Sequence, residues 1–169
     1  MTKTESMDIR VTDTDETIKL GEIIGKSLAP GSIIALRGGL GAGKTVLVKG
    51  IARGLGIEDE PVSPTFVIMN AYEGRIPLYH FDLYRISGAD ELMGVGADEF
   101  LFGGGVSAVE WAERVEEIFP EYTIYIDIRI PGAESGVPEN TREIKIEGKK
   151  EWVSSFRSTA EQALPASTR

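Results

Sequence analysis

Hydrophobic and polar residues follow two different periods along this chain. A continuous apolar run at residues 33–36 predicts a buried strand, and strict alternation over residues 122–130 predicts a strand with one buried face. After Asp13 and after Lys44, apolar residues recur at the spacing of one helix face. Strands that alternate with helices in this way predict an α/β fold.

The remaining elements follow from the same pattern and from its breaks. In chain order they are a short strand at 8–11, a helix from 13 to 27 or 28, a β-hairpin with strands at 66–72 and 76–84, a helix at 89–102 interrupted by glycines, a buried strand at 106–109, a charged helix at 111–119, a last strand at 142–146 and a terminal helix at 152–164. We expect a single domain over residues 1–169, with loose ends at about 1–7 and 165–169. Its fold class is α/β, with a mostly parallel central sheet, an antiparallel hairpin flank and helices on both faces.

The segment between the first buried strand and its helix carries the pattern G-x-x-x-x-G-K-[ST], the phosphate-binding loop of P-loop NTPases. Glycines let the backbone turn tightly with its N–H groups facing inward, and the following helix N-terminus attracts an anion. Lys44 can reach the outer phosphates, and the hydroxyl of Thr45 can enter the shell of a magnesium ion. The pattern predicts that ATP or another nucleoside triphosphate binds with Mg²⁺ at these residues: Gly38, Gly39, Leu40, Gly41, Ala42, Gly43, Lys44 and Thr45.

Composition and charge narrow the functional classes. The chain of 169 residues has 18 basic and 27 acidic residues and a net charge of −9, which disfavours direct binding to a phosphate backbone. It has no cysteine and one histidine, His80, so thiol chemistry is excluded and a multi-histidine zinc site is disfavoured. No apolar stretch reaches membrane-spanning length and the N-terminus lacks an apolar signal segment, so we expect a cytoplasmic protein without a membrane partner.

Hydrolysis needs a metal anchor and a group that orders the attacking water, and two carboxylates stand where such groups are expected. Glu110 ends the predicted strand at 106–109, and Asp82 lies in the returning strand of the hairpin. Either could also be a solvated strand-end residue, and Glu110 is the stronger of the two. Thr65 lies in a rigid turn where other nucleotide hydrolases keep a switch threonine, although taken alone the segment is better explained as an ordinary helix-to-strand turn. Trp111 can stack near the site or pack in the core.

Four short segments occur in a characteristic order: GAGKT at 41–45, SPTF at 63–66, HFDLYR at 80–85 and VEW at 109–111. Their succession resembles the TsaE (YjeE) family of small bacterial P-loop ATPases over residues 14–146. The resemblance implies a Mg²⁺-dependent ATPase, weak alone, that works with the TsaD–TsaB heterodimer in forming N6-threonylcarbamoyladenosine beside the anticodon of tRNAs that read ANN codons. It also implies that tRNA is met only through the partner complex, which agrees with the acidic charge.

The resemblance further implies roles for individual residues. Those implied in catalysis are Lys44, Asp82, Glu110 and Thr65; those implied near the metal are Thr45, Glu110 and Asp82; those implied near the nucleotide, outside the loop, are Thr14, Trp111 and Arg142. One position departs from the family pattern, because the family commonly has Asp where this chain has Gly39.

Two other functions remain open at this point. A small-molecule kinase can be built on the same loop, but such kinases usually close an arginine-bearing lid over the phosphates. Residues 88–105, where a lid would lie, contain no Lys or Arg. A nucleotide-binding scaffold without hydrolysis is the other alternative, and Glu110 and Asp82 argue against it.

Overall fold

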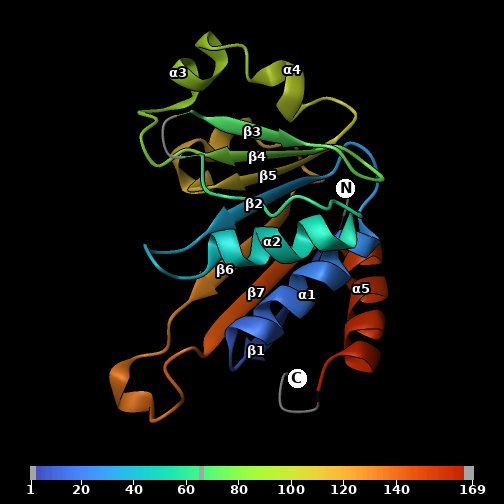
Figure 1. The fold of residues 1–169 in the computed structure, drawn as a ribbon, viewed down its shortest axis with the longest axis vertical. Helices are drawn as coiled ribbons and strands as arrows, with labels where there is room; N and C mark the ends of the chain where they lie inside the picture. Colours follow the sequence, from blue (N-terminus) through green and yellow to red (C-terminus); the bar gives the residue numbers. More distant parts are fainter. Residues whose placement is uncertain (1–2, 65–66, 166–169) are drawn as a thin grey trace.

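A twisted sheet organises the part of the chain that the computed structural model describes, residues 3–64 and 67–165 (Figure 1). The strand order in these residues is β1-β7-β6-β2-β5-β4-β3. The strands are β1 (Thr4–Val11), β2 (Ile33–Arg37), β3 (Met69–Tyr72), β4 (Leu78–Asp82), β5 (Val106–Glu110), β6 (Ile124–Arg129) and β7 (Arg142–Lys149). Strands β6, β2, β5 and β4 pair in parallel, and β3, β7 and β1 join them antiparallel. The predicted α/β class, with a parallel centre and an antiparallel hairpin at one edge, is confirmed.

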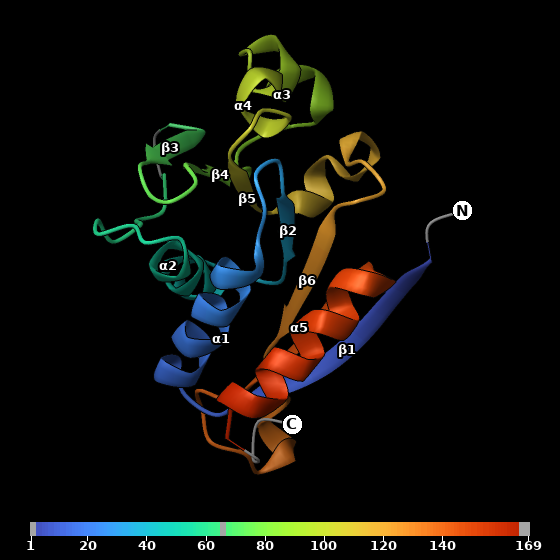
Figure 2. The same ribbon diagram turned by 90° about the vertical axis from the view of Figure 1, so that its right-hand side faces the viewer.

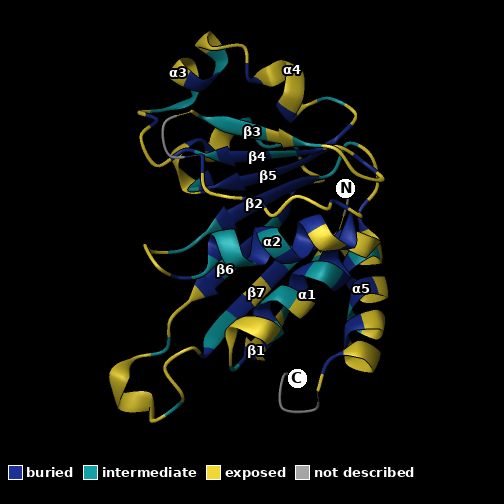
Figure 3. Ribbon diagram, in the orientation of Figure 1, coloured by how far each residue is buried: buried dark blue, intermediate teal, exposed yellow. Residues whose placement is uncertain are grey.

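Helices cover both faces of this sheet (Figure 2). The helices α1 (Thr14–Ser27), α2 (Lys44–Gly54) and α5 (Lys150–Ala163) share one core with Ile34 and Leu36 of β2. The short helices α3 (Ala89–Gly94) and α4 (Asp98–Leu101) share another core with Ile33 and Ala35. Alternate residues of β2 therefore face opposite layers, and the central strands are buried on both sides (Figure 3). None of the helices in the described residues is both long and apolar enough to cross a membrane.

The N-terminal strand is longer than the pattern predicts. It begins at Thr4 rather than at residue 8, because it pairs along its whole length with β7, from Thr4 opposite Lys149 to Val11 opposite Arg142. The helix that follows begins as predicted. Asp13 caps it by accepting a hydrogen bond from the Glu16 amide at 2.8 Å, while the Glu16 carboxylate accepts from the Thr12 amide at 2.7 Å.

Helices α1 and α2 run in the same direction and touch through glycines. A Cβ on Gly21 would lie 2.4 Å from the Leu47 carbonyl oxygen, and one on Gly25 would lie 2.3 Å from the Ile51 carbonyl oxygen. Gly50 and Gly54 face the same two positions from α2. Because the backbones meet this closely in parallel register, the N-terminal end of α1 lies beside the N-terminal end of α2, where Lys44 stands.

The segment after β5 is the clearest difference from the predicted elements. Residues 111–119 form two short 3₁₀ helices, η1 (Ala112–Arg114) and η2 (Glu116–Ile118), instead of one α-helix. Trp111 adopts a left-handed backbone conformation with φ of 59°, so the chain turns sharply directly after Glu110. A third 3₁₀ turn, η3 (Ala133–Ser135), lies in the loop between β6 and β7.

Candidate nucleotide-binding site

The loop at residues 38–43 connects the carboxyl end of β2 to the first residue of α2. Gly41 and Gly43 have φ of 77° and 107°, in the left-handed region that glycine adopts without a side-chain penalty. Gly43 also stands at the N-cap of α2 without a side-chain cap, so the first amides of the helix face the loop. Gly39 is different: its φ is not in that region and a Cβ there would meet nothing within 4 Å, so this fold leaves room for a side chain at that position.

Lys44 folds back over this loop. Its Nζ donates hydrogen bonds to the carbonyl oxygens of Gly38 at 2.6 Å and Gly39 at 3.0 Å, and it lies 4.1 Å from the centre of the Trp111 ring. The residue is only 5% exposed. Burial lowers the pKa of its ammonium group from the usual value, while the carboxylates of Glu110, Glu113 and Asp82 act in the opposite direction. The site therefore holds a poorly solvated cation at the start of a helix.

Glu110 and Thr45 are joined directly. The Thr45 hydroxyl lies 3.0 Å from Oε1 and 2.9 Å from Oε2 of Glu110. Glu110 is buried, with 3% of its surface exposed. This contact depends on the register of the sheet. Leu36 near the end of β2 pairs with Glu110 at the end of β5, so Glu110 lies beside the loop and helix that follow β2. A second contact was not predicted: Nε2 of His80 also bonds Oε2 of Glu110.

Asp82 ends β4 and pairs in register with Glu110, so the two carboxylate-bearing residues stand on neighbouring strands. Its Oδ2 accepts a hydrogen bond from the Ser63 hydroxyl at 2.7 Å, and its Oδ1 accepts one from the Tyr84 amide at 3.0 Å. Asp82 therefore ties the segment that contains Ser63 to the end of the sheet. Thr65, for which we expect a switch role, lies outside the described residues.

Three predicted residues surround the loop in different ways. Thr14 is the first residue of α1 and is exposed, at the helix end that lies beside the start of α2. Trp111 contacts Lys44 and also packs against Tyr84, with ring centres 5.0 Å apart. Arg142, the first residue of β7, donates from Nε to the Ala42 carbonyl oxygen at 2.9 Å.

The Arg142 guanidinium makes three further contacts, all with carbonyl oxygens. These acceptors are Thr141 at 2.8 Å, Glu139 at 3.0 Å and Gly41 at 3.4 Å. The side chain thus fastens the outer side of the loop to the β6–β7 connection. In the structure it is a support of the loop backbone, whereas sequence reasoning placed it only near the nucleotide.

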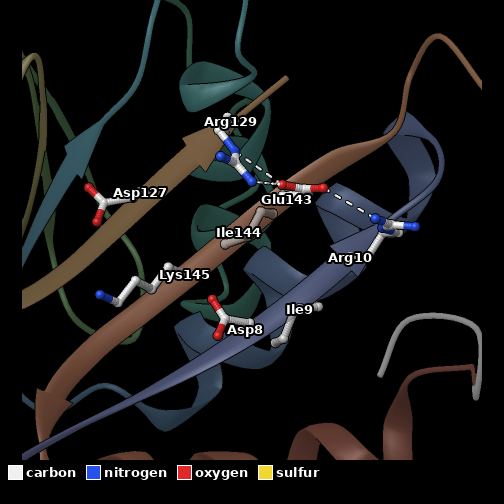
Figure 4. Close-up of a pocket in the computed structure, with 8 residues that line it drawn as sticks. All are labelled: Asp8, Ile9, Arg10, Asp127, Arg129, Glu143, Ile144 and Lys145. Carbon is white, nitrogen blue, oxygen red and sulfur yellow. Dashed lines mark hydrogen bonds and ion pairs between the residues drawn. The ribbon is translucent and has the colours of Figure 1, made fainter. Parts of the chain in front are cut away.

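A hollow of about 350 Å³ adjoins the loop. Its lining includes Leu40, Ser63, Asp82, Tyr84 and Trp111. A larger hollow of about 610 Å³ lies over β1, β7 and β6, on the sheet face opposite α1 and α2, and none of its lining residues belongs to the loop (Figure 4).

Several of the charged side chains that line the larger hollow form ion pairs. Glu143 lies between two arginines, with Nε of Arg129 at 3.0 Å and Nη2 of Arg10 at 3.2 Å from its carboxylate (Figure 4). Hydrogen bonds from Arg129 and then Arg10 lower the pKa of Glu143. Because this hollow shares no residue with the loop, we place the candidate nucleotide site at the loop.

The residues at the loop fit a magnesium nucleotide. Among the described residues, no group of three or more His, Cys, Asp or Glu side chains is arranged to hold a metal ion without further ligands. Magnesium in nucleotide sites typically takes one or two protein oxygens and completes its shell with phosphates and water. The adjoining oxygens of Thr45 and Glu110 match that donor set.

Comparisons with known proteins agree with this geometry. Residues 11–144 match the family described as "Threonylcarbamoyl adenosine biosynthesis protein TsaE". The chain belongs to the TsaE family. A curated TsaE protein of Treponema pallidum (strain Nichols) is 45% identical over 115 residues, which cover 68% of this chain and 85% of that protein. The TsaE protein of Bacillus subtilis (strain 168) is 42% identical over 124 residues, covering 73% and 77% of the two chains.

A solved structure extends the likeness to the whole fold. The crystal structure of Bacillus subtilis YdiB superposes with a TM-score of 0.73 at 31% identity, covering 96% of this chain and 98% of that one. Membership of the TsaE family, together with the P-loop NTPase fold, implies a protein that binds a nucleotide.

Proposed function

We propose that this chain is a Mg²⁺-dependent ATPase of the cytoplasm that works with the TsaD–TsaB heterodimer. In this proposal it supports formation of N6-threonylcarbamoyladenosine beside the anticodon of ANN-decoding tRNAs, is weakly active alone, and meets tRNA only through the heterodimer. Family membership supports the pathway. One observation supports the proposed chemistry. Lys44 and Thr45 begin α2 beside the loop, and the Thr45 hydroxyl donates a hydrogen bond to the Glu110 carboxylate.

Each residue has a defined task in this proposal. Lys44 exchanges the carbonyl oxygens of Gly38 and Gly39 for phosphate oxygens, which are stronger acceptors for a poorly solvated ammonium group. The amides of the loop and of the first turn of α2 hold the remaining phosphate oxygens. Bound magnesium neutralises phosphate charge and polarises the bond that breaks.

Two carboxylates then complete the site. Thr45 and Glu110 supply oxygens for the magnesium shell, and Asp82 on the neighbouring strand accepts a hydrogen bond from a water that attacks the outer phosphate or that binds the metal. Thr65, which follows the Ser63–Asp82 contact in the chain, is the proposed switch residue. Trp111, Thr14 and Arg142 border the nucleotide.

A calorimetric titration with ATP, in Mg²⁺ and in EDTA, tests the nucleotide site. Lys44→Ala should weaken ATP binding about 100-fold, because charge-assisted hydrogen bonds contribute about 1.5–3 kcal/mol each. Lys49→Ala is the matched control, since Lys49 lies on the same helix but pairs with Glu60 at 3.4 Å on the surface. Equal affinities of the two variants would remove Lys44 from the phosphate site.

The metal site and the pathway need two further assays. Glu110→Ala should retain much of the EDTA-resistant nucleotide binding and lose hydrolysis at saturating Mg²⁺. Co-purification with TsaD and TsaB, with and without ATP, together with a reconstituted modification assay, tests the partnership. A chain that converts ATP to ADP only while it phosphorylates a small-molecule acceptor, and that never joins the heterodimer, would favour the kinase alternative.

A further inference from the structure

His80 is the only histidine of the chain and lies in the centre of the sheet, fully buried. It sits on β4 opposite Ala108 of β5, so it is the diagonal neighbour of Glu110 on the face that carries α2. Its Nε2 bonds Oε2 of Glu110, and its Nδ1 is buried without a hydrogen-bond partner among the described residues.

This pattern of contacts indicates which ring nitrogen carries the proton. A carboxylate can only accept hydrogen bonds, so Nε2 is the donor. In the neutral ring Nδ1 then presents only a lone pair, and leaving a lone pair unpaired is less costly than leaving an N–H group unpaired. The ring therefore offers a single directed donor, and that donor is aimed at Glu110.

Glu110 needs such a donor because it is 3% exposed. A buried carboxylate is held in place by its hydrogen bonds, and among the described residues its side-chain donors are His80 and Thr45. A magnesium ion would take the Thr45 oxygen as a ligand. His80 would then be the remaining side-chain donor to the carboxylate among the described residues, and its bond to Oε2 would leave Oε1 for the ion.

We propose that His80 is a positioning residue of the magnesium site, which orients Glu110 through its Nε2–H group. This inference rests on the proposed role of Glu110 as a metal-shell residue. It predicts that loss of the donor lowers the affinity for Mg²⁺ and leaves nucleotide binding without metal unchanged. The reason is that the described contacts of Lys44 with the loop do not include His80.

Two amide substitutions separate this role from simple packing. Gln at position 80 can place its amide nitrogen near the position of Nε2, whereas the shorter Asn places it near the position of Nδ1. We expect His80→Asn to weaken the apparent affinity for Mg²⁺ at saturating ADP about 10–100-fold, the range found when the partners of metal ligands are removed. His80→Gln should restore most of that affinity, and both variants should bind ADP in EDTA like the wild type.

Ser107→Ala is the matched control for lost buried polar contacts. Ser107 is also buried in β5, where its hydroxyl lies 3.3 Å from the Leu101 carbonyl oxygen, on the opposite face from Glu110. This variant should lower stability without changing the affinity for Mg²⁺. If His80→Asn and Ser107→Ala retain the same affinity for Mg²⁺, or if His80→Gln is impaired as much as His80→Asn, the proposal is overturned.

A measurement on the unmodified chain remains decisive should His80→Asn fail to fold. Because the chain has one histidine, its ring nitrogens give an unambiguous ¹⁵N spectrum. We expect a protonated Nε2 whose resonance shifts when Mg²⁺ is added to the ADP-saturated chain, and an unmoved resonance would refute the proposal. A wild-type chain whose ADP affinity is the same in Mg²⁺ and in EDTA would instead contradict the proposed metal site itself.

Discussion

Replacing Gly50 with alanine should test whether the contact between α1 and α2 determines the stability of the loop region. Gly50 lies in the middle of α2, and a Cβ there would stand 2.2 Å from the Ile18 carbonyl oxygen and 2.8 Å from the Gly21 Cα. Both obstacles are main-chain atoms of α1, so no side-chain rotation relieves them. One helix must move away by roughly 1 Å to restore ordinary contact.

The expected cost follows from two opposing effects. Overpacking of a well-packed contact costs typically about 1–3 kcal/mol, while alanine gains about 1 kcal/mol over glycine in a helix interior. Because the crowding involves backbone on one side and a rigid helix on the other, we place the cost at the upper end of that range, and the net loss in the free energy of unfolding is then about 2 kcal/mol. For a chain of this size that loss lowers Tm by roughly 4–8 °C.

Gly94→Ala is the matched control, because Gly94 ends α3 and a Cβ there meets nothing within 4 Å. It should leave stability unchanged or raise it by up to about 1 kcal/mol. Urea unfolding followed by circular dichroism gives the free energy of unfolding of both variants. Equal m-values would show that both variants expose the same surface on unfolding, so that the two free energies can be compared. A Gly50→Ala chain as stable as the Gly94→Ala chain would refute the close backbone contact. ATP affinity should fall with Gly50→Ala, since the displaced helix carries Lys44.

Two further predictions concern the cations at the loop. Burial lowers the pKa of Lys44 in the free chain, and bound phosphate would raise it. Binding should therefore take up a proton in alkaline solution, and ATP affinity should fall as pH rises toward the usual lysine pKa of about 10.4. Calorimetry in buffers of different ionisation enthalpy measures that uptake, and constant affinity with no uptake would contradict the prediction. Arg142→Met should weaken the binding of ATP and of ADP by the same factor, about 10-fold, because the guanidinium donates a hydrogen bond to the Ala42 carbonyl oxygen and so supports the loop. A selective loss of ATP affinity would instead indicate direct contact with the outermost phosphate.

Much of the site could be predicted because its determinants are local. The loop, its strand and its helix are contiguous, so one pattern in residues 33–55 specifies where Lys44 and Thr45 stand. The capping of α1 by Asp13 is equally local and was predicted from the spacing of Asp13 and Glu16. Local determinants also explain why the hairpin and the interrupted helix were found close to their observed positions.

The remaining features depend on which strands become neighbours. No sequence pattern indicates a partner for His80, because its bond to Glu110 depends on the register in which β4 and β5 pair. Arg142 lies 100 residues from Ala42 in the chain, so its support of the loop follows from the return of β7 to the sheet. The left-handed turn at Trp111, which replaced the predicted helix, places that ring on Lys44. Alternation of apolar residues determines which face of a strand is buried, but it does not determine which strand lies beside it.

The charges around the loop give a physical reason why nucleotide binding at the proposed site would need a metal ion. The carboxylates that act on Lys44 are those of Glu110, Glu113 and Asp82, so the immediate surroundings of the ammonium are acidic, as is the chain as a whole. A polyphosphate that enters this setting meets repulsion that one lysine and the helix N-terminus only partly offset. In the proposed function Thr45 and Glu110 would hold a divalent cation, and its charge would offset that repulsion. The carboxylates that would repel a bare nucleotide would therefore favour a magnesium-bound one, and the proposed site would bind the magnesium complex more tightly than the free anion.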